Sequence, residues 1–111
     1  MTAMRPPFSE ARRIAEWCHA LSNPKRVQVL LLLDRDGPHT VTEVAERLGM
    51  ELSNASRALT TLHAVGLVNR SRVGHGISYA TAHAPAWISL VENRVAGATP
   101  IPSRRGDSLR D

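Results

Sequence analysis

The chain has no acidic residue at positions 52–91, although aspartate and glutamate together occur 10 times among its 111 residues. The same span contains Arg57, Arg70 and Arg72. Because phosphates and other anions repel carboxylates, a stretch with arginine and without acids favours an anionic partner. The formal charge of +4 favours polyanions in general, and does not by itself separate nucleic acid from a membrane surface.

Cysteine is also scarce, since Cys18 is the only one, and this excludes a disulfide within the chain. No N-terminal apolar segment resembles a signal peptide, so we expect a cytoplasmic protein. The longest unbroken apolar run covers residues 29–33, far short of the roughly 20 residues that a membrane helix needs. We therefore expect no membrane partner.

The length and the 42% hydrophobic content predict one small domain. Residues 1–8 and 99–111 are rich in proline, polar and charged residues and lack periodicity, so both are expected to be disordered tails. The domain between them is predicted at residues 9–98.

Three helices are predicted in the first half of the domain. Residues 9–21 carry one apolar stripe, formed by Ile14, Trp17, Cys18 and Leu21. Asn23 as N-cap and Pro24 at the first helical position open a second helix, which Gly37 and Pro38 end. A capping box of Thr40 and Glu43 opens a short third helix, which ends at Gly49.

A fourth helix is predicted at residues 52–64, and it has a sharply divided surface. Its expected inward row is Leu52, Ala55, Leu59 and Leu62, and its outward residues are Ser53, Asn54, Arg57, Thr60 and Thr61. The pattern then changes to two strands around Gly74, His75 and Gly76, which predicts a β-hairpin. A last helix from about Pro85 carries Trp87, Ile88, Val91 and Val95.

Two short helices joined by a tight turn and followed by a hairpin predict a helix-turn-helix with a wing. The fold class is therefore mainly α, with five helices and a two-stranded β-hairpin wing. A helix in the major groove needs short outward side chains and no carboxylates, as this fourth helix has. The predicted DNA-contacting residues are Ser53, Asn54, Ser56, Arg57, Thr60, Thr61, Arg70, Arg72 and His75, with bases read by Asn54 and Arg57 and phosphates met by Arg70 and Arg72.

Three segments together carry a family resemblance across residues 11–95: "ALSNPKRVQVLLLL", "TVTEVAERLGMELSNASRALTTLHAVGLV" and "RSRVGHGISYA". In order and spacing they resemble the ArsR/SmtB family of small bacterial winged helix-turn-helix repressors. The resemblance implies a homodimer built from the first and last helices, an operator with two half-sites and repression relieved by an inducer. Two positions depart from the family pattern: Glu51 stands where serine usually caps the helix, and Leu52 replaces a common polar residue.

A physical reason for dimerisation is that Trp17 and Trp87 lie on terminal amphipathic helices that so small a domain hardly covers. The expected dimer interface consists of Ile14, Trp17, Cys18, Leu21, Trp87, Ile88, Val91 and Val95. Because Cys18 lies on an apolar stripe, we expect it to be a buried core residue, with a redox-active pair between two subunits as the alternative.

No metal, cofactor or catalytic group is predicted. Thr40 and Thr42 stand where the resemblance would place the thiolate pair of a metal site, and hydroxyls are poor ligands for soft metals. His83 and Glu92 do not complete the family's terminal-helix zinc site. A site assembled across the dimer from Cys18, His19 or His83 stays open as an alternative.

The sequence also leaves alternatives for the function. The competing class is a winged-helix module that binds an acidic protein through the same basic surface. An enzyme is disfavoured because no serine, histidine and carboxylate grouping and no glycine-rich phosphate loop occurs. The inducer is not identifiable from the sequence: a small organic ligand, a thiol oxidant, another protein or no effector are all compatible with it.

Overall fold

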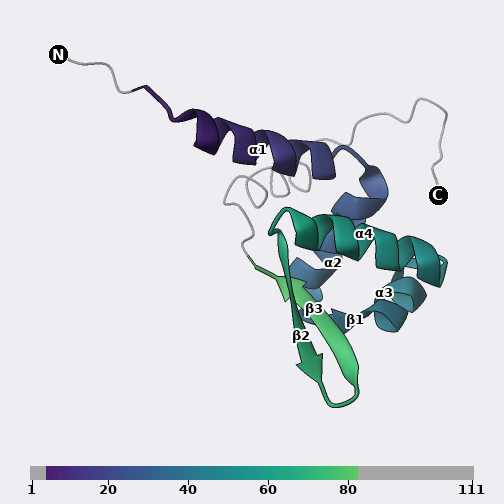
Figure 1. The fold of residues 1–111 in the computed structure, drawn as a ribbon. Coiled ribbons are helices and arrows are strands. Elements are labelled where there is room, and N and C mark those ends of the chain that lie inside the picture. The colour runs from purple at the N-terminus through teal and green to yellow at the C-terminus, as the bar shows by residue number, and fades with distance from the viewer. Residues whose placement is uncertain (1–4, 83–111) are drawn as a thin grey trace, which may run out of the picture.

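The computed structural model describes residues 5–82, which form four helices and a small antiparallel sheet. In Figure 1 helix α1 lies across one end of the molecule, with the other helices grouped beneath it and a hairpin projecting away from them. The elements are α1 (Phe8–Ala20), α2 (Pro24–Asp36), β1 (His39–Thr40), α3 (Val41–Leu48), α4 (Leu52–Ala64), β2 (Val68–Val73) and β3 (Gly76–Thr81).

The predicted fold class is confirmed in this part of the chain, which is mainly helical with a hairpin after the fourth helix. The predicted ranges of the four helices agree with the observed ones to within about a residue at each end. The predicted fifth helix, with Trp87, Ile88, Val91 and Val95, lies outside the described residues. The same holds for the C-terminal tail at residues 99–111 and for residues 1–4 of the N-terminal tail, whereas Phe8, predicted as its last residue, begins α1.

Helix α2 begins as its sequence predicts. The Oδ1 atom of Asn23 accepts hydrogen bonds from the backbone N–H groups of Lys25 at 2.8 Å and Arg26 at 3.4 Å. Pro24 needs no such partner because it has no N–H group. The helix ends at Gly37, whose φ of 84° is accessible to glycine at little cost.

Helix α3 has the predicted capping box. The hydroxyl of Thr40 accepts a hydrogen bond from the backbone N–H of Glu43 at 3.1 Å, and the Oε1 atom of Glu43 accepts one from the N–H of Thr40 at 2.8 Å. Gly49 closes the helix in the left-handed conformation, with a φ of 64°. The capping box and the glycine together hold α3 to two turns, which places α4 directly after it.

Replacing Thr40 with alanine should lower the free energy of unfolding by about 0.5 to 2 kcal/mol, because the N–H of Glu43 loses its acceptor. Thr42→Ala is the matched control, since Thr42 is an exposed residue of the same helix. Urea denaturation of the two variants measures the difference. Equal stability of both variants would show that the capping box does not contribute to the fold.

The sheet contains one strand that the sequence does not predict. Strand β1 pairs antiparallel with β3, with His39 opposite Tyr79 and Thr40 opposite Ser78, so the strand order is β1-β3-β2. Two residues are too few to show a period of two, and the pairing partner lies far along the chain. This pairing attaches the hairpin to the start of α3.

The core lies between α2, α3, α4 and the base of the hairpin. Its largest fully buried side chains are Val29, Leu30, Leu33, Val44, Leu59, Leu62, Leu67 and Val68. Of the predicted inward row of α4, Ala55, Leu59 and Leu62 are buried as expected. The prediction for Leu52 is wrong: its side chain is 56% exposed, because it is the first residue of the helix and the core does not reach that end.

Helix α1 is joined to the rest of the domain mainly through its second half. Trp17 is half-buried and its Nε1–H donates a hydrogen bond of 2.8 Å to the carbonyl oxygen of Val65, while Leu21 packs against the core. Ile14 is 47% exposed and Cys18 is exposed as well. The expectation that Cys18 is a core residue is therefore wrong for the single chain.

Candidate nucleic-acid interface

The outward face of α4 carries most of the residues predicted to contact DNA. Ser53, Ser56, Arg57 and Thr60 are exposed, whereas Asn54 and Thr61 are half-buried at its margins. The opposite face, with Ala55, Ala58, Leu59 and Leu62, is buried in the core. The core thus holds α4 in one rotational position and leaves its polar side to solvent.

Arg57 is available to an external anion. Its Nη1 atom lies 3.5 Å from the Oδ1 atom of Asn54, one turn earlier, which is a long hydrogen bond. No carboxylate among residues 5–82 forms an ion pair with it. A guanidinium has five N–H donors, so most of them are left for base edges or phosphates.

The start of α4 has no side-chain cap. Glu51 occupies the N-cap position, but its carboxylate accepts no hydrogen bond from the first turn. The backbone N–H groups of that turn therefore lack a side-chain acceptor, and such groups favour negative charge. Glu51 is also the last acid before the acid-free span, so this span begins with the first residue of the helix.

The hairpin presents its two arginines on one face. Arg70 lies opposite Tyr79 and Arg72 opposite Ile77, and directly opposed residues of an antiparallel pair point to the same side. Tyr79 is buried, so this is the side that faces the core at the base of the hairpin, yet both arginines are exposed. Neither forms an ion pair within the described part of the chain.

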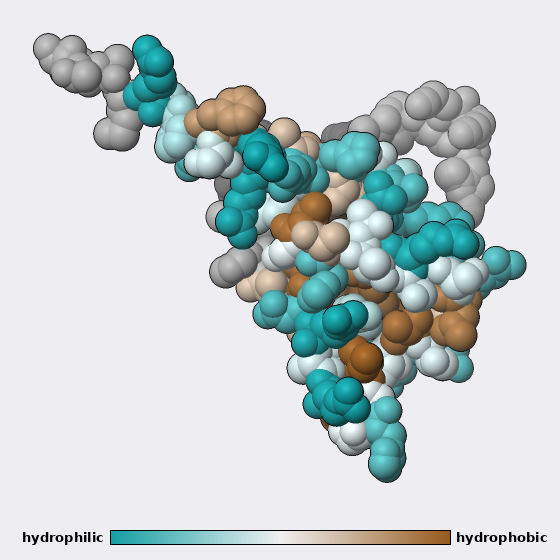
Figure 2. Space-filling view, viewed as in Figure 1, coloured by the Kyte–Doolittle hydropathy of each residue, from teal (hydrophilic) through white to brown (hydrophobic). Residues whose placement is uncertain are grey.

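The tip of the hairpin carries His75, which is exposed in a turn next to Gly74 with a φ of 61°. Val73 and Ile77 on either side of the turn are also exposed, at 63% and 42%. Figure 2 shows this mixture, since hydrophilic and hydrophobic residues lie next to each other along the projecting hairpin. The wing therefore offers both charged and apolar groups to a partner.

Comparison with known proteins agrees with this geometry. Residues 21–71 match the family model described as a helix-turn-helix domain. A crystal structure of residues 1–100 of a possible transcriptional regulatory protein from Mycobacterium bovis has a TM-score of 0.66 at 32% identity, and the match covers 79% of this chain and 95% of that chain. The solution structure of a homodimeric winged helix-turn-helix DNA-binding domain from the same organism, a possible ArsR-family regulator, has a TM-score of 0.69 at 29% identity over 85% and 92% of the two chains. The chain belongs to the ArsR family of transcriptional regulators.

Among curated relatives of this ArsR-family chain is the HTH-type transcriptional regulator NmtR of Mycobacterium tuberculosis, which is 42% identical over 69 residues. That match covers 62% of this chain and 57% of NmtR. The uncharacterized regulator YfiV of Bacillus subtilis is 34% identical over 58 residues, which are 36% of its length. The chain thus spans little more than half of the length of NmtR and about a third of the length of YfiV.

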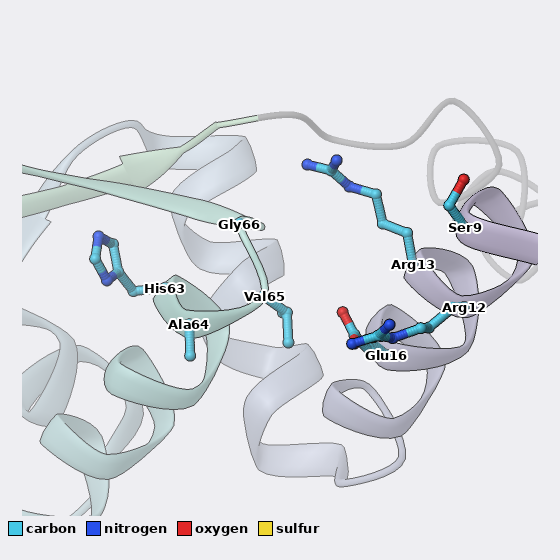
Figure 3. Close-up of a pocket in the computed structure, with 8 residues that line it drawn as sticks. All are labelled: Ser9, Arg12, Arg13, Glu16, His63, Ala64, Val65 and Gly66. Atoms are coloured by element: carbon cyan, nitrogen blue, oxygen red, sulfur yellow. The ribbon is translucent and has the colours of Figure 1, made fainter.

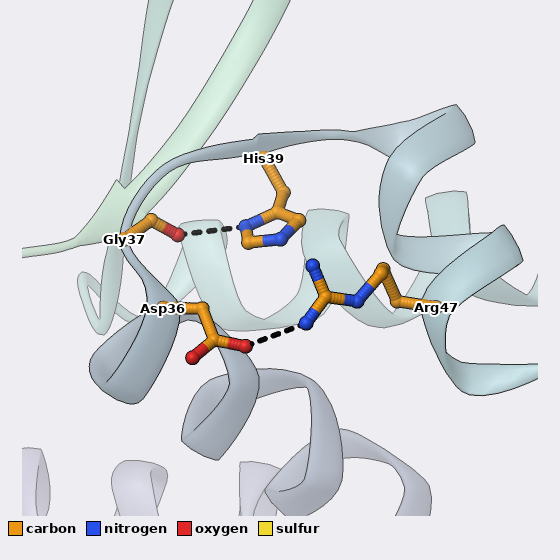
Figure 4. A network of polar contacts seen from close by, with 4 residues as sticks. All are labelled: Asp36, Gly37, His39 and Arg47. Carbon is orange, nitrogen blue, oxygen red and sulfur yellow. Dashed lines mark hydrogen bonds and ion pairs between the residues drawn. The ribbon is translucent and has the colours of Figure 1, made fainter.

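A polar network holds the helix-turn-helix of this family member to α2, as Figure 4 shows. Arg47 of α3 donates a hydrogen bond of 2.8 Å to the Oδ2 atom of Asp36, at the end of α2. The Nδ1 atom of His39 lies 2.8 Å from the carbonyl oxygen of Gly37, so it must carry the proton and donate. His39 is 6% exposed. The burial of His39 and its hydrogen bond to Gly37 are not predictable from the sequence, because nothing local distinguishes this histidine from the others.

A second feature lies between α1 and the end of α4. A cavity of about 420 Å³ is lined by Ser9, Arg12, Arg13, Glu16, His63, Ala64, Val65 and Gly66. Figure 3 shows Arg13 extending across its opening toward Gly66, and the guanidinium carbon of Arg13 lies 5.7 Å from the centroid of the Trp17 ring. None of the residues predicted to contact DNA lines this cavity. It belongs to the joint between α1 and α4.

The described residues do not bring together a metal site. No three histidine, cysteine, aspartate or glutamate side chains among residues 5–82 lie close enough to hold an ion. Thr40, at the position of a thiolate in the family's third-helix site, is used in the capping box. His83 and Glu92 lie outside the described residues. None of the helices in the described part is long and apolar enough to cross a membrane.

Proposed function

We propose that this ArsR-family chain is a sequence-specific repressor that binds duplex DNA as a homodimer. The observation that carries the proposal is the exposed face of α4, where Ser53, Ser56, Arg57 and Thr60 lie outward and no acid occurs. A helix with a buried apolar side and a short, polar, basic outer side suits the major groove, which admits one α-helix. The family membership supports this assignment.

In this proposal the chemistry of each side chain determines which part of the DNA it contacts. Arg57 and Asn54 reach base edges, because a guanidinium matches the two acceptors of guanine and an amide matches adenine. Ser53, Ser56, Thr60 and Thr61 position the helix in the groove. Arg70 and Arg72 of the wing meet phosphates, which fix the position of the protein without reading sequence, and His75 lies where the wing tip approaches the backbone.

The homodimer is proposed to form through α1 together with residues beyond the described part. Ile14 and Cys18 are exposed on the single chain and belong to the apolar stripe of α1, so a second copy would cover them. Trp17 and Leu21 are already partly covered within the single chain, since both pack against its core. A homodimeric relative from Mycobacterium bovis supports the assembly. Two-fold symmetry would place the two α4 helices about 34 Å apart, one turn of DNA.

Regulation is proposed to act on the distance between the two α4 helices of the dimer. The hydrogen bond from Trp17 to Val65 links α1, the proposed dimerisation helix, to the C-terminal end of α4. An inducer that changes how the two α1 helices meet would therefore change the distance between the two α4 helices. We propose no metal for this role, and the chemical class of the inducer is left open. The location is proposed to be the cytoplasm, where the operator DNA is.

The function is tested by selection from a random pool of duplexes, followed by binding of the purified protein to the selected duplex and to an unrelated one. A preference of about 10³-fold or more supports the repressor. Equal and weak binding to both would favour the alternative, in which the basic surface binds an acidic protein. Shortening the selected duplex is a second criterion, because a dimer on two half-sites loses affinity once one half-site is removed.

The two wing arginines should affect affinity and salt dependence without affecting sequence preference. Arg70→Ala and Arg72→Ala are each expected to weaken binding to selected and unrelated duplexes alike. The slope of log affinity against log salt should become shallower by about one for each bound chain. The reason is that each variant loses one phosphate contact, so binding releases about one counterion fewer.

Lys25→Ala is the charge-matched control for the wing arginines. It removes one exposed positive charge at the start of α2, outside α4 and the wing. Titrations at several salt concentrations should show an unchanged slope for this variant. If the slope also stays unchanged in the Arg70→Ala and Arg72→Ala variants, these two arginines do not contact DNA phosphates.

A further inference from the structure

An exposed leucine stands at the front of the helix proposed to read DNA. Leu52 is the first residue of α4 and its side chain is 56% exposed, whereas the other leucines of the helix, Leu59 and Leu62, are fully buried. Leu52 is also absent from the apolar residues that pack against the core. Burial within the chain therefore does not account for a leucine at this position.

The direction of the side chain follows from helix geometry. In an α-helix each Cα–Cβ bond tilts toward the N-terminus, so a side chain covers the turn that precedes its own Cα. Leu52 is the first residue of α4, so no earlier turn of this helix lies beneath its side chain. Glu51 before it makes no capping hydrogen bond with the first turn. The leucine therefore projects ahead of the helix. In a helix-turn-helix protein, the N-terminal residues of the recognition helix are the ones that contact base edges.

The chemistry of the groove then selects one base. In the major groove guanine, cytosine and adenine are distinguished by their hydrogen-bond donors and acceptors, and thymine alone adds a methyl group. Leucine has no donor or acceptor, so against a polar edge it would displace water without replacing its hydrogen bonds, which is unfavourable. Against a methyl group it buries apolar surface on both sides.

We propose that Leu52 is a specificity-determining residue that reads the 5-methyl group of a thymine in each operator half-site. The inference rests on the proposed function, since it needs α4 in the major groove. It adds a base preference that the polar residues of α4 do not supply. The selected operator should then contain a thymine at one fixed position in each half-site.

The test replaces thymine with deoxyuridine, one position at a time, in the duplex obtained by selection. Deoxyuridine keeps every hydrogen bond of the base pair and lacks only the methyl group. The wild-type protein should lose affinity by about fourfold per half-site at one thymine position, because binding then buries one methyl group less. Leu52→Ala should bind the thymine and deoxyuridine duplexes with equal affinity, because the group that contacts the methyl is gone.

A matched control separates this contact from general effects of uracil on the duplex. Phe8→Ala removes another exposed apolar side chain, at the start of α1 and outside α4 and the wing, and should keep the wild-type dependence on the same methyl group. If the wild type is indifferent to every replacement, or if Leu52→Ala keeps the full dependence, the inference is overturned while the repressor stands. If the selection yields no preferred duplex, the proposed function fails and this inference with it.

Discussion

Replacing Arg57 with alanine is expected to weaken binding to the operator by about 1 to 3 kcal/mol for each half-site and to relax the preference at one base pair. The reason is that Arg57 is exposed on the outward face of α4 and has no carboxylate partner among residues 5–82. Its guanidinium is therefore available for two parallel hydrogen bonds to one guanine, which alanine cannot form.

The measurement is binding of the variant to the selected duplex and to a set of duplexes with each base pair changed in turn. A base contact predicts that discrimination falls at one position and persists at the others. Lys25→Ala removes the same charge from α2 and should leave this discrimination intact. If Arg57→Ala weakens all duplexes by one common factor, Arg57 meets a phosphate. If affinity is unchanged, α4 is not the recognition helix.

Replacing Leu59 with alanine is expected to lower the free energy of unfolding by about 2 to 5 kcal/mol. Leu59 is fully buried on the inner face of α4, among residues of α2, α3 and the base of the hairpin. Removing its branched end leaves a cavity that the surrounding helices fill only partly, so the loss exceeds the transfer free energy of the missing carbon atoms. This is a large part of the 5 to 15 kcal/mol that usually stabilises a small domain.

Leu52→Ala is the matched control for this variant, because it is the same change in the same helix at an exposed position. Urea denaturation followed by circular dichroism should show a strongly lowered midpoint for Leu59→Ala and a nearly unchanged one for Leu52→Ala. Comparable losses for both would mean that Leu52 is packed, in a dimer or in another way, and would contradict the exposure on which its proposed role depends.

Local signals in the sequence were sufficient for most of the fold. Asn23 with Pro24 marked the start of α2, and the Thr40 and Glu43 pair marked the start of α3, because caps depend on residues three or four positions apart. The apolar period of α4 identified its inner side correctly at Ala55, Leu59 and Leu62. Polar residues at the remaining positions then defined the outward face. The part of the candidate interface that lies on α4 could therefore be predicted from the sequence.

The wing was predicted less completely. The change to a period of two and the glycines around His75 indicated the hairpin, and its strands are observed as β2 and β3. The third strand was missed, since His39 and Thr40 are recognisable as a strand only beside Tyr79 and Ser78. For the same reason the sequence did not show that Arg70 and Arg72 share a face with the buried Tyr79, although their spacing of two placed them together.

By itself the sequence determined the order and limits of the four described helices, the hairpin and the acid-free span, because each depends on spacing within a few residues. Only the tertiary structure decided which apolar residues are covered. It buried His39 beside the hairpin, and it left Leu52 and Cys18 exposed although both continue an apolar stripe. A stripe records which side of a helix faces inward, but whether the core extends to a given turn depends on segments distant in the chain.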